Sequence, residues 1–285
     1  MQVRTVGVLG CGLMGGGIAQ TIAAAGYTTV VREVSPDLLQ KGMGRIRKTL
    51  DDAVAKGKTP AETRDRAMAN LSGVTTFDAL ADCDLIIEAI VEALEDKRAA
   101  YAAVEQVVRP DAIIASNTSS LCITELAAAT KRPDRFAGLH FFNPVPLMKL
   151  VEVIRALTTS NETFDTVFAF ATALGKDPVA APDRPGFIVN RLLIPYLLDA
   201  IRAFENKLGT LEDIDKGMKL GCGFPMGPFT LLDFIGLDTT YYIANIMFEE
   251  FCEARFAPPP LLKRMVVAGR LGRKSGEGFY TYQKP

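Results

Sequence analysis

The sequence contains no tryptophan and a single histidine, His140, among its 285 residues. Chemistry that needs an imidazole as proton carrier therefore has one candidate, and a site built from several histidines is excluded. The five cysteines are scattered, with no pair at Cys-x-x-Cys spacing: Cys11, Cys83, Cys122, Cys222 and Cys252. This pattern predicts neither a metal site nor a disulfide framework, and it favours a reducing, cytoplasmic compartment.

An excess of charge of one sign is also lacking. The 32 basic and 33 acidic side chains give a formal net charge of −1, which gives no support for binding to nucleic acid or to an acidic membrane surface. No apolar run approaches the roughly 18 residues of a membrane span, and we expect none. The first predicted strand starts so early that no signal peptide is expected.

The beginning of the chain carries the first motif. A short apolar run over residues 6–9 predicts a strand buried on both faces, and the pattern Gly-x-Gly-x-x-Gly follows it. Its glycines permit a tight turn, a close approach of backbone to a pyrophosphate, and close packing of helix on strand. The Ala-rich segment that follows, residues 18–25, predicts a helix directed at the phosphates. The residues expected to hold a dinucleotide here are Gly10, Gly12, Leu13, Met14 and Gly15.

An acidic residue follows the next predicted strand, residues 28–31. Glu33 lies 18 residues beyond Gly15, where an acid that bonds the adenine ribose 2′-hydroxyl is expected. Its carboxylate repels the 2′-phosphate of NADP and favours NAD, whereas the neighbouring Arg32 could accept that phosphate. Strand, turn, helix, strand and acid together predict a dinucleotide site and NAD as cofactor.

Residues 36–70 predict a charged helical pair that is interrupted near residues 56–60. Such an insertion is longer than a crossover requires. It could hold a phosphorylated substrate tail, or it could be a helical hairpin with ordinary surface charge. The basic candidates for binding such a tail are Arg45, Lys48, Lys56 and Lys58.

Strand and helix patterns alternate up to residue 184, and only helical patterns follow. Further strands are predicted at residues 84–92, 112–117, 135–142, 150–154 and 177–180. The pattern predicts an α/β fold for residues 1–184. This domain is expected to be a Rossmann-type, mostly parallel sheet with a helical insertion. An all-α domain is predicted over residues 185–285, and its Phe, Met and Leu residues also suit a dimer interface.

Polar residues that could take part in catalysis lie near the predicted strand ends and the domain boundary. A turn at residues 143–146 could bring Glu152 beside His140, where a carboxylate fixes the imidazole tautomer and supports the cation. With a nicotinamide cofactor, such a pair can oxidise an alcohol or reduce a ketone. Ser119 and Asn190 are further candidates. Structural alternatives stay open: a core histidine, a helix-capping serine and a structural asparagine.

The chain resembles the L-3-hydroxyacyl-CoA dehydrogenases. The matching stretches cover nearly the whole chain in order: 10–15, 88–92, 116–120, 140–144, 149–153, 185–191, 225–228, 233–238 and 272–280. The elements His-Phe-Phe-Asn-Pro, starting at His140, and Pro-Gly-Phe-x-x-Asn-Arg, ending at Arg191, are far more specific than the glycine motif.

The resemblance implies that His140 is the catalytic base paired with Glu152, and that Ser119 and Asn190 contact the 3-oxygen of an acyl-CoA substrate. It implies a homodimer formed through the C-terminal helical domain. Lys56 stands where relatives hold the CoA tail, whereas Asp52 replaces a lysine common at another such position. The NAD site implied beyond the glycine turn comprises Glu33, Ala89, Ile90, Glu92, Lys97, Asn117 and Ser119.

Two other functions stay open from sequence. One is a dehydrogenase of a free small hydroxy acid or sugar acid on the same fold, which would act on substrates lacking CoA. The other is a dinucleotide-binding protein that has lost turnover. The full set of Ser119, His140, Glu152 and Asn190 argues against the latter, because a binding module needs none of them.

Overall fold

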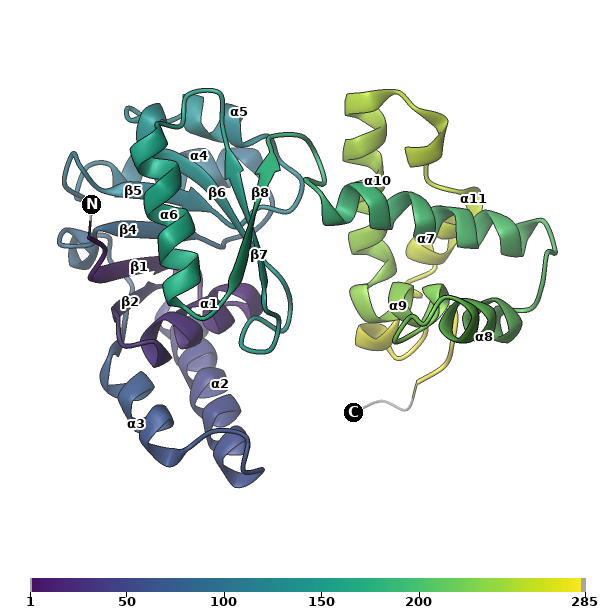
Figure 1. Ribbon diagram of the computed structural model, residues 1–285, viewed down its shortest axis with the longest axis horizontal. Coiled ribbons are helices and arrows are strands. Elements are labelled where there is room, and N and C mark those ends of the chain that lie inside the picture. The colour runs from purple at the N-terminus through teal and green to yellow at the C-terminus, as the bar shows by residue number, and fades with distance from the viewer. Residues whose placement is uncertain (1, 283–285) are drawn as a thin grey trace. The chain divides into compact units, whose positions relative to one another are not determined.

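The protein, seen in a computed structural model that describes residues 2–282, forms two compact units (Figure 1). They comprise Met1–Asp183 and Arg184–Pro285. Each has its own hydrophobic core, so each is described separately.

The first unit is built on one sheet of eight strands in the order β3-β2-β1-β4-β5-β6-β7-β8. The strands are β1 Thr5–Leu9, β2 Thr28–Arg32, β3 Leu71–Val74, β4 Leu85–Glu88, β5 Ile113–Ser116, β6 Phe136–Phe141, β7 Leu150–Arg155 and β8 Asp177–Pro182. All neighbouring pairs are parallel except β6 and β7. The predicted mostly parallel Rossmann-type sheet is confirmed.

Helices cover both faces of this sheet (Figure 1). They are α1 Leu13–Ala24, α2 Pro36–Ala55, α3 Ala61–Ala69, α4 Leu94–Val104, α5 Ile123–Ala128 and α6 Asn161–Ala173, with short 3₁₀ turns η1 Asp78–Leu80 and η2 Pro133–Arg135. Ile22 of α1, Val167 of α6 and Val8 of β1 are buried in one hydrophobic core. On α4, Tyr101 meets Phe136 of β6 edge-on, with ring centroids 5.3 Å apart. Side chains alternate between the faces because strand periodicity is two.

One local prediction was wrong, and one strand was missed. Helix α1 begins at Leu13 rather than near Ile18, because it starts directly at the glycine turn. Strand β3 was not predicted, since it is a four-residue edge strand with only Leu71 buried. Its Gly73 has a packing reason: a Cβ there would lie 2.9 Å from Leu39 Cδ1 of α2.

The second unit is helical, as predicted. Its elements are α7 Val189–Glu205, α8 Leu211–Gly221, α9 Pro228–Ile235, α10 Leu237–Phe251, α11 Pro260–Val267 and 3₁₀ turns η3 Ala254–Phe256 and η4 Arg273–Ser275. Pro195 lies inside α7 without ending it. Leu197, Phe229 and Met247 are fully buried in the core. Within residues 2–282, no helix has the length and apolar character needed to cross a membrane.

Candidate active site

The glycine turn after β1 shows which glycines the protein itself requires. Gly10 has φ 95°, where a side chain is strained, and a Cβ on Gly15 would lie 2.1 Å from the Gly10 carbonyl oxygen. A Cβ on Gly12 would meet no atom within 4 Å. The space before Gly12 is therefore open to a ligand, and it suits the pyrophosphate that such a turn accepts.

A cleft of about 770 Å³ extends from this turn across the carboxyl ends of the central strands. Most residues expected at the cofactor line it: Gly10, Gly12, Leu13, Met14, Glu33, Ala89, Ile90, Lys97 and Asn117. Gly15, Glu92 and Ser119 do not line it. Gly15 packs under the turn, while Glu92 and Ser119 are joined by a hydrogen bond, Ser119 N–H to Glu92 Oε1 at 3.1 Å.

The two charged residues at the end of β2 differ in their contacts. Glu33 accepts hydrogen bonds from the backbone N–H groups of Cys11 at 2.8 Å and Val34 at 2.7 Å. Its carboxylate keeps further lone pairs for ribose hydroxyls. Arg32 also lines the cleft, but it donates to the Thr75 carbonyl at 3.2 Å and stacks on Phe77. A carboxylate that can accept from ribose hydroxyls, beside an arginine that already has partners, fits NAD.

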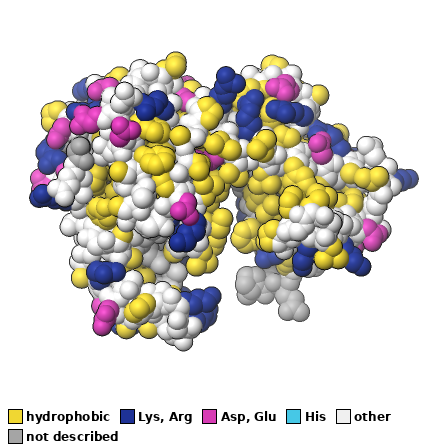
Figure 2. Space-filling model, viewed as in Figure 1, with side chains coloured by type: hydrophobic (Ala, Val, Ile, Leu, Met, Phe, Trp, Pro, Cys, Tyr) yellow, Lys and Arg dark blue, Asp and Glu magenta, His cyan; other side chains and the backbone are white. Residues whose placement is uncertain are grey.

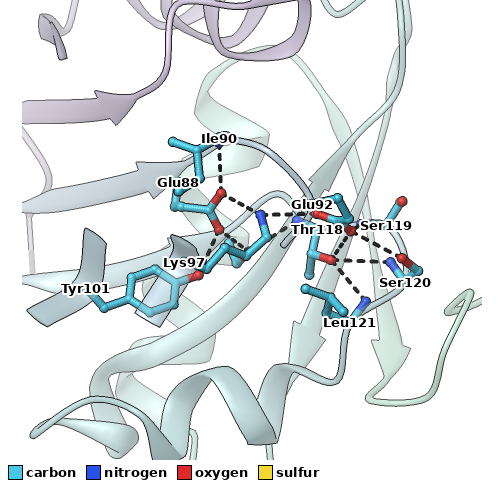
Figure 3. A network of polar contacts seen from close by, with 10 residues as sticks. Glu88, Ile90, Glu92, Lys97, Tyr101, Thr118, Ser119, Ser120 and Leu121 are labelled. Atoms are coloured by element: carbon cyan, nitrogen blue, oxygen red, sulfur yellow. Dashed lines mark hydrogen bonds and ion pairs between the residues drawn. The ribbon is translucent and has the colours of Figure 1, made fainter. Parts of the chain in front are cut away.

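A network of polar side chains lies where β4 and β5 end (Figure 3). Lys97 Nζ lies 2.6 Å from Glu88 Oε1 and 3.1 Å from Glu92 Oε2. Burial raises the pKa of Glu92, but the charge of Lys97 and a hydrogen bond from Thr118 outweigh this and lower it. Glu92 thus holds the backbone at Ser119 as an anion.

His140 and Glu152 are brought together by strand pairing. They are opposite each other in the antiparallel β6–β7 pair, and His140 Nδ1 lies 2.7 Å from Glu152 Oε2. Glu152 is fully buried and His140 is 6% exposed. The cleft reaches this strand through Asn117, whose Oδ1 accepts the Phe141 N–H at 2.9 Å. The predicted contact of His140 with Glu152 is present, but the two strands are joined by the longer connection 142–149 and not by a turn at residues 143–146 alone.

The interpretation of Ser119 as a helix cap is wrong. Helix α5 begins at Ile123, and the Asp183 carboxylate accepts the N–H groups of Ile123 at 2.8 Å and Thr124 at 2.7 Å. Ser119 lies instead at one end of the polar network, and Tyr101 lies at the other end (Figure 3).

The other expected substrate residues lie on helices. Asn190 is the second residue of α7, in the helical unit. Lys56 follows α2 and is exposed. Asp52 pairs with Lys48 at 2.8 Å, which occupies one of the predicted basic candidates.

Sequence reasoning missed part of the polar network. Tyr101 donates a hydrogen bond to Glu88, and Thr118 and Ser120 donate to Glu92, but none of the three was predicted as a site residue. The sequence signals were polar residues at the ends of two apolar runs, Glu88 and Glu92 after one and residues 117–120 after the next. They mark strand ends but do not show which side chains bond one another.

Comparison with known proteins decides the family. Residues 5–184 match the sequence model described as "3-hydroxyacyl-CoA dehydrogenase, NAD binding domain". Residues 186–282 match that of "3-hydroxyacyl-CoA dehydrogenase, C-terminal domain". The chain belongs to the 3-hydroxyacyl-CoA dehydrogenase family. It is thus an NAD-dependent oxidoreductase, as the resemblance implied.

Similar family members come from bacteria and animals. A 3-hydroxybutyryl-CoA dehydrogenase of Mycobacterium tuberculosis is 50% identical, covering 98% of this chain and 99% of the relative. The human mitochondrial hydroxyacyl-coenzyme A dehydrogenase is 47% identical over 99% of this chain and 92% of its own. The crystal structure of (S)-3-hydroxybutyryl-CoA dehydrogenase from Ralstonia eutropha superimposes with TM-score 0.95 at 44% identity, covering 99% and 100% of the two chains.

Proposed function

We propose that this family member interconverts L-3-hydroxyacyl-CoA and 3-ketoacyl-CoA with His140 as general acid–base, and that 3-hydroxybutyryl-CoA and acetoacetyl-CoA are its working pair. The observation that carries the proposal is the His140–Glu152 contact of 2.7 Å between β6 and β7. Phe141, which follows His140, is bonded to Asn117 in the lining of the cleft. The names of the bacterial relatives support the short acyl chain.

Glu152 determines how His140 handles protons. A fully buried carboxylate accepts the Nδ1 hydrogen, which assigns the lone pair of the neutral ring to Nε2. In the oxidative direction, Nε2 removes the hydroxyl proton, and Glu152 stabilises the resulting imidazolium. In the reductive direction, the imidazolium returns that proton to the forming alkoxide. A positioned acid–base group contributes about 10²–10⁴-fold.

Bound NAD supplies the hydride acceptor, and NADH the donor. Glu33 would hold the adenine ribose and the open backbone at Gly12 would approach the pyrophosphate. Lys97 and Asn117 line the part of the cleft over β4 and β5. Ser119 and Asn190 are assigned to the substrate 3-oxygen, a role that shortens the hydride path by positioning.

Lys56, the surface of the helical unit and the cysteines support further assignments. Lys56 is exposed and is assigned to the CoA phosphates. The helical unit exposes Leu192 at 73% and Leu220 at 70%, and Figure 2 shows hydrophobic side chains gathered on its surface. Apolar patches of this kind support a homodimer through that unit. The five cysteines are free thiols, which suits the cytoplasm.

NADH consumption with acetoacetyl-CoA, beside free acetoacetate and NADPH, tests the proposal. Fast loss of NADH with the CoA ester alone is expected. Activity on free acetoacetate would instead favour a dehydrogenase of free acids. Preference for NADPH would show that Arg32 outweighs Glu33.

A further inference from the structure

The Glu88 carboxylate is fully buried and accepts four hydrogen bonds. Oε1 takes the Ile90 N–H at 2.8 Å and Lys97 Nζ at 2.6 Å, while Oε2 takes the hydroxyls of Tyr101 and Ser116, each at 2.7 Å (Figure 3). Burial, and then the charge of Glu88, raise the pKa of Tyr101 well above its usual value, so this phenol stays neutral. All acceptor positions of an ionised carboxylate are thereby used.

The charge of Lys97 can be balanced without the Glu88 carboxylate. Lys97 is 1% exposed and lies within 3.1 Å of Glu92 as well as against Glu88. A neutral residue at position 88 would leave a matched Lys97–Glu92 pair. Burying a charge is costly, yet Glu88 adds one negative charge at this point. The arrangement suggests that the added charge acts on something besides Lys97.

The position of Glu88 in the sheet indicates on which group its charge acts. Glu88 ends β4, and Ser116 ends β5, while Lys97 and Ile90 of the same network line the cleft. In a doubly wound sheet, Glu33 marks the adenine half, and the nicotinamide half lies over the strands on the other side of β1. The oxidised nicotinamide ring is positively charged and the reduced ring is neutral. A nearby negative charge therefore favours the oxidised form.

We propose that Glu88 sets the preference of this enzyme between the two redox states of its cofactor, strengthening NAD⁺ binding relative to NADH. Glu88 is a specificity-determining residue that acts by its charge, from beneath the cleft wall. This inference rests on the proposed location of NAD in the cleft.

The test measures equilibrium dissociation constants of NAD⁺ and NADH by calorimetry, without acyl substrate. The Glu88→Gln variant removes one negative charge with little change of shape. Its ratio Kd(NAD⁺)/Kd(NADH) is expected to rise by about three- to tenfold, because a charge beside a partly shielded site interacts by this order. The ratio should change little with salt, since buried charges are weakly screened.

Two matched variants separate charge from structure. Tyr101→Phe removes a hydrogen bond to the same carboxylate but keeps its charge, so its ratio should equal that of the wild type. The double variant Glu88→Gln with Lys97→Met keeps the wild-type net charge, because Glu92 remains. Its ratio should return to the wild-type value even where both affinities fall.

Three results, in a protein whose wild type binds both nucleotides, would overturn the inference. One is an equal change of both dissociation constants in Glu88→Gln, which would make Glu88 purely structural. Another is a Tyr101→Phe ratio that moves as far as that of Glu88→Gln. If Glu88→Gln does not fold, Glu92→Gln removes the same negative charge from the group of Glu88, Glu92 and Lys97. An unchanged ratio in that variant is the third result, because it would show that the charge of this group does not act on the cofactor. A wild-type protein that binds neither nucleotide would overturn the proposed function, and this inference with it.

Discussion

Buried acidic side chains occur in both compact units, but their partners differ. In the sheet unit, Glu152 pairs with His140 and Glu88 with Lys97. In the helical unit, Asp233 is 1% exposed and accepts the backbone N–H groups of residues 279 and 280, each at 2.9 Å. Asp215 likewise accepts the N–H of residue 229 at 2.7 Å. Each of these two aspartates also accepts one tyrosine hydroxyl, but within residues 2–282 neither pairs with a basic side chain as Glu152 and Glu88 do. We therefore expect the aspartates to hold the chain in place and the two glutamates to serve the reaction.

The largest expected effect is at His140. His140→Gln cannot carry the proton, so turnover with acetoacetyl-CoA and NADH should fall by at least about 10²-fold. NADH affinity and the thermal midpoint should stay near the wild-type values, because Gln fits the site and the cleft is unchanged. Turnover within twofold of the wild type would remove His140 from the mechanism.

An acid of the helical unit should behave in the opposite way. Asp233→Asn leaves an amide facing backbone donors, and we expect the free energy of unfolding to fall by about 1–3 kcal/mol. Turnover per folded molecule should be retained. Denaturant titration and active-site-normalised rates measure the two effects. A large loss of rate with unchanged stability would show that Asp233 serves the reaction and not the fold.

A smaller effect is expected at Asp84, an acid of the sheet unit that resembles those of the helical unit. Burial raises its pKa, but amide donation by Thr5 and Arg4 and the charge of Arg109 lower it below the usual 3.8. A lowered pKa stabilises the fold above about pH 4, and this stability is lost as the pH falls through the folded-state pKa. Asp84→Asn should therefore destabilise the protein at pH 6 and much less at pH 3.

The unfolding free energies of the wild type and Asp84→Asn at these two pH values check the sign. An equal difference at both would show that the contribution of Asp84 does not depend on its charge.

Sequence predicted those parts of the site that depend on local pattern. The glycine turn and Glu33 after the second strand follow from spacing, and the facing of His140 and Glu152 follows from two strands that are consecutive in the chain. The cap of α5 was missed because Asp183 lies 60 residues from Ile123. The contact of Glu88 with Ser116 spans 28 residues. Such contacts are set by the packing of parallel strands, for which no local pattern exists.

Glu152 is expected to act through His140, and a double-mutant cycle measures this coupling. Turnover is measured for Glu152→Gln in the wild-type background and in the His140→Gln background. We predict a loss of about 10-fold or more in the first and almost none in the second, since residues that act as one unit are not additive. Equal losses in both backgrounds would contradict the account.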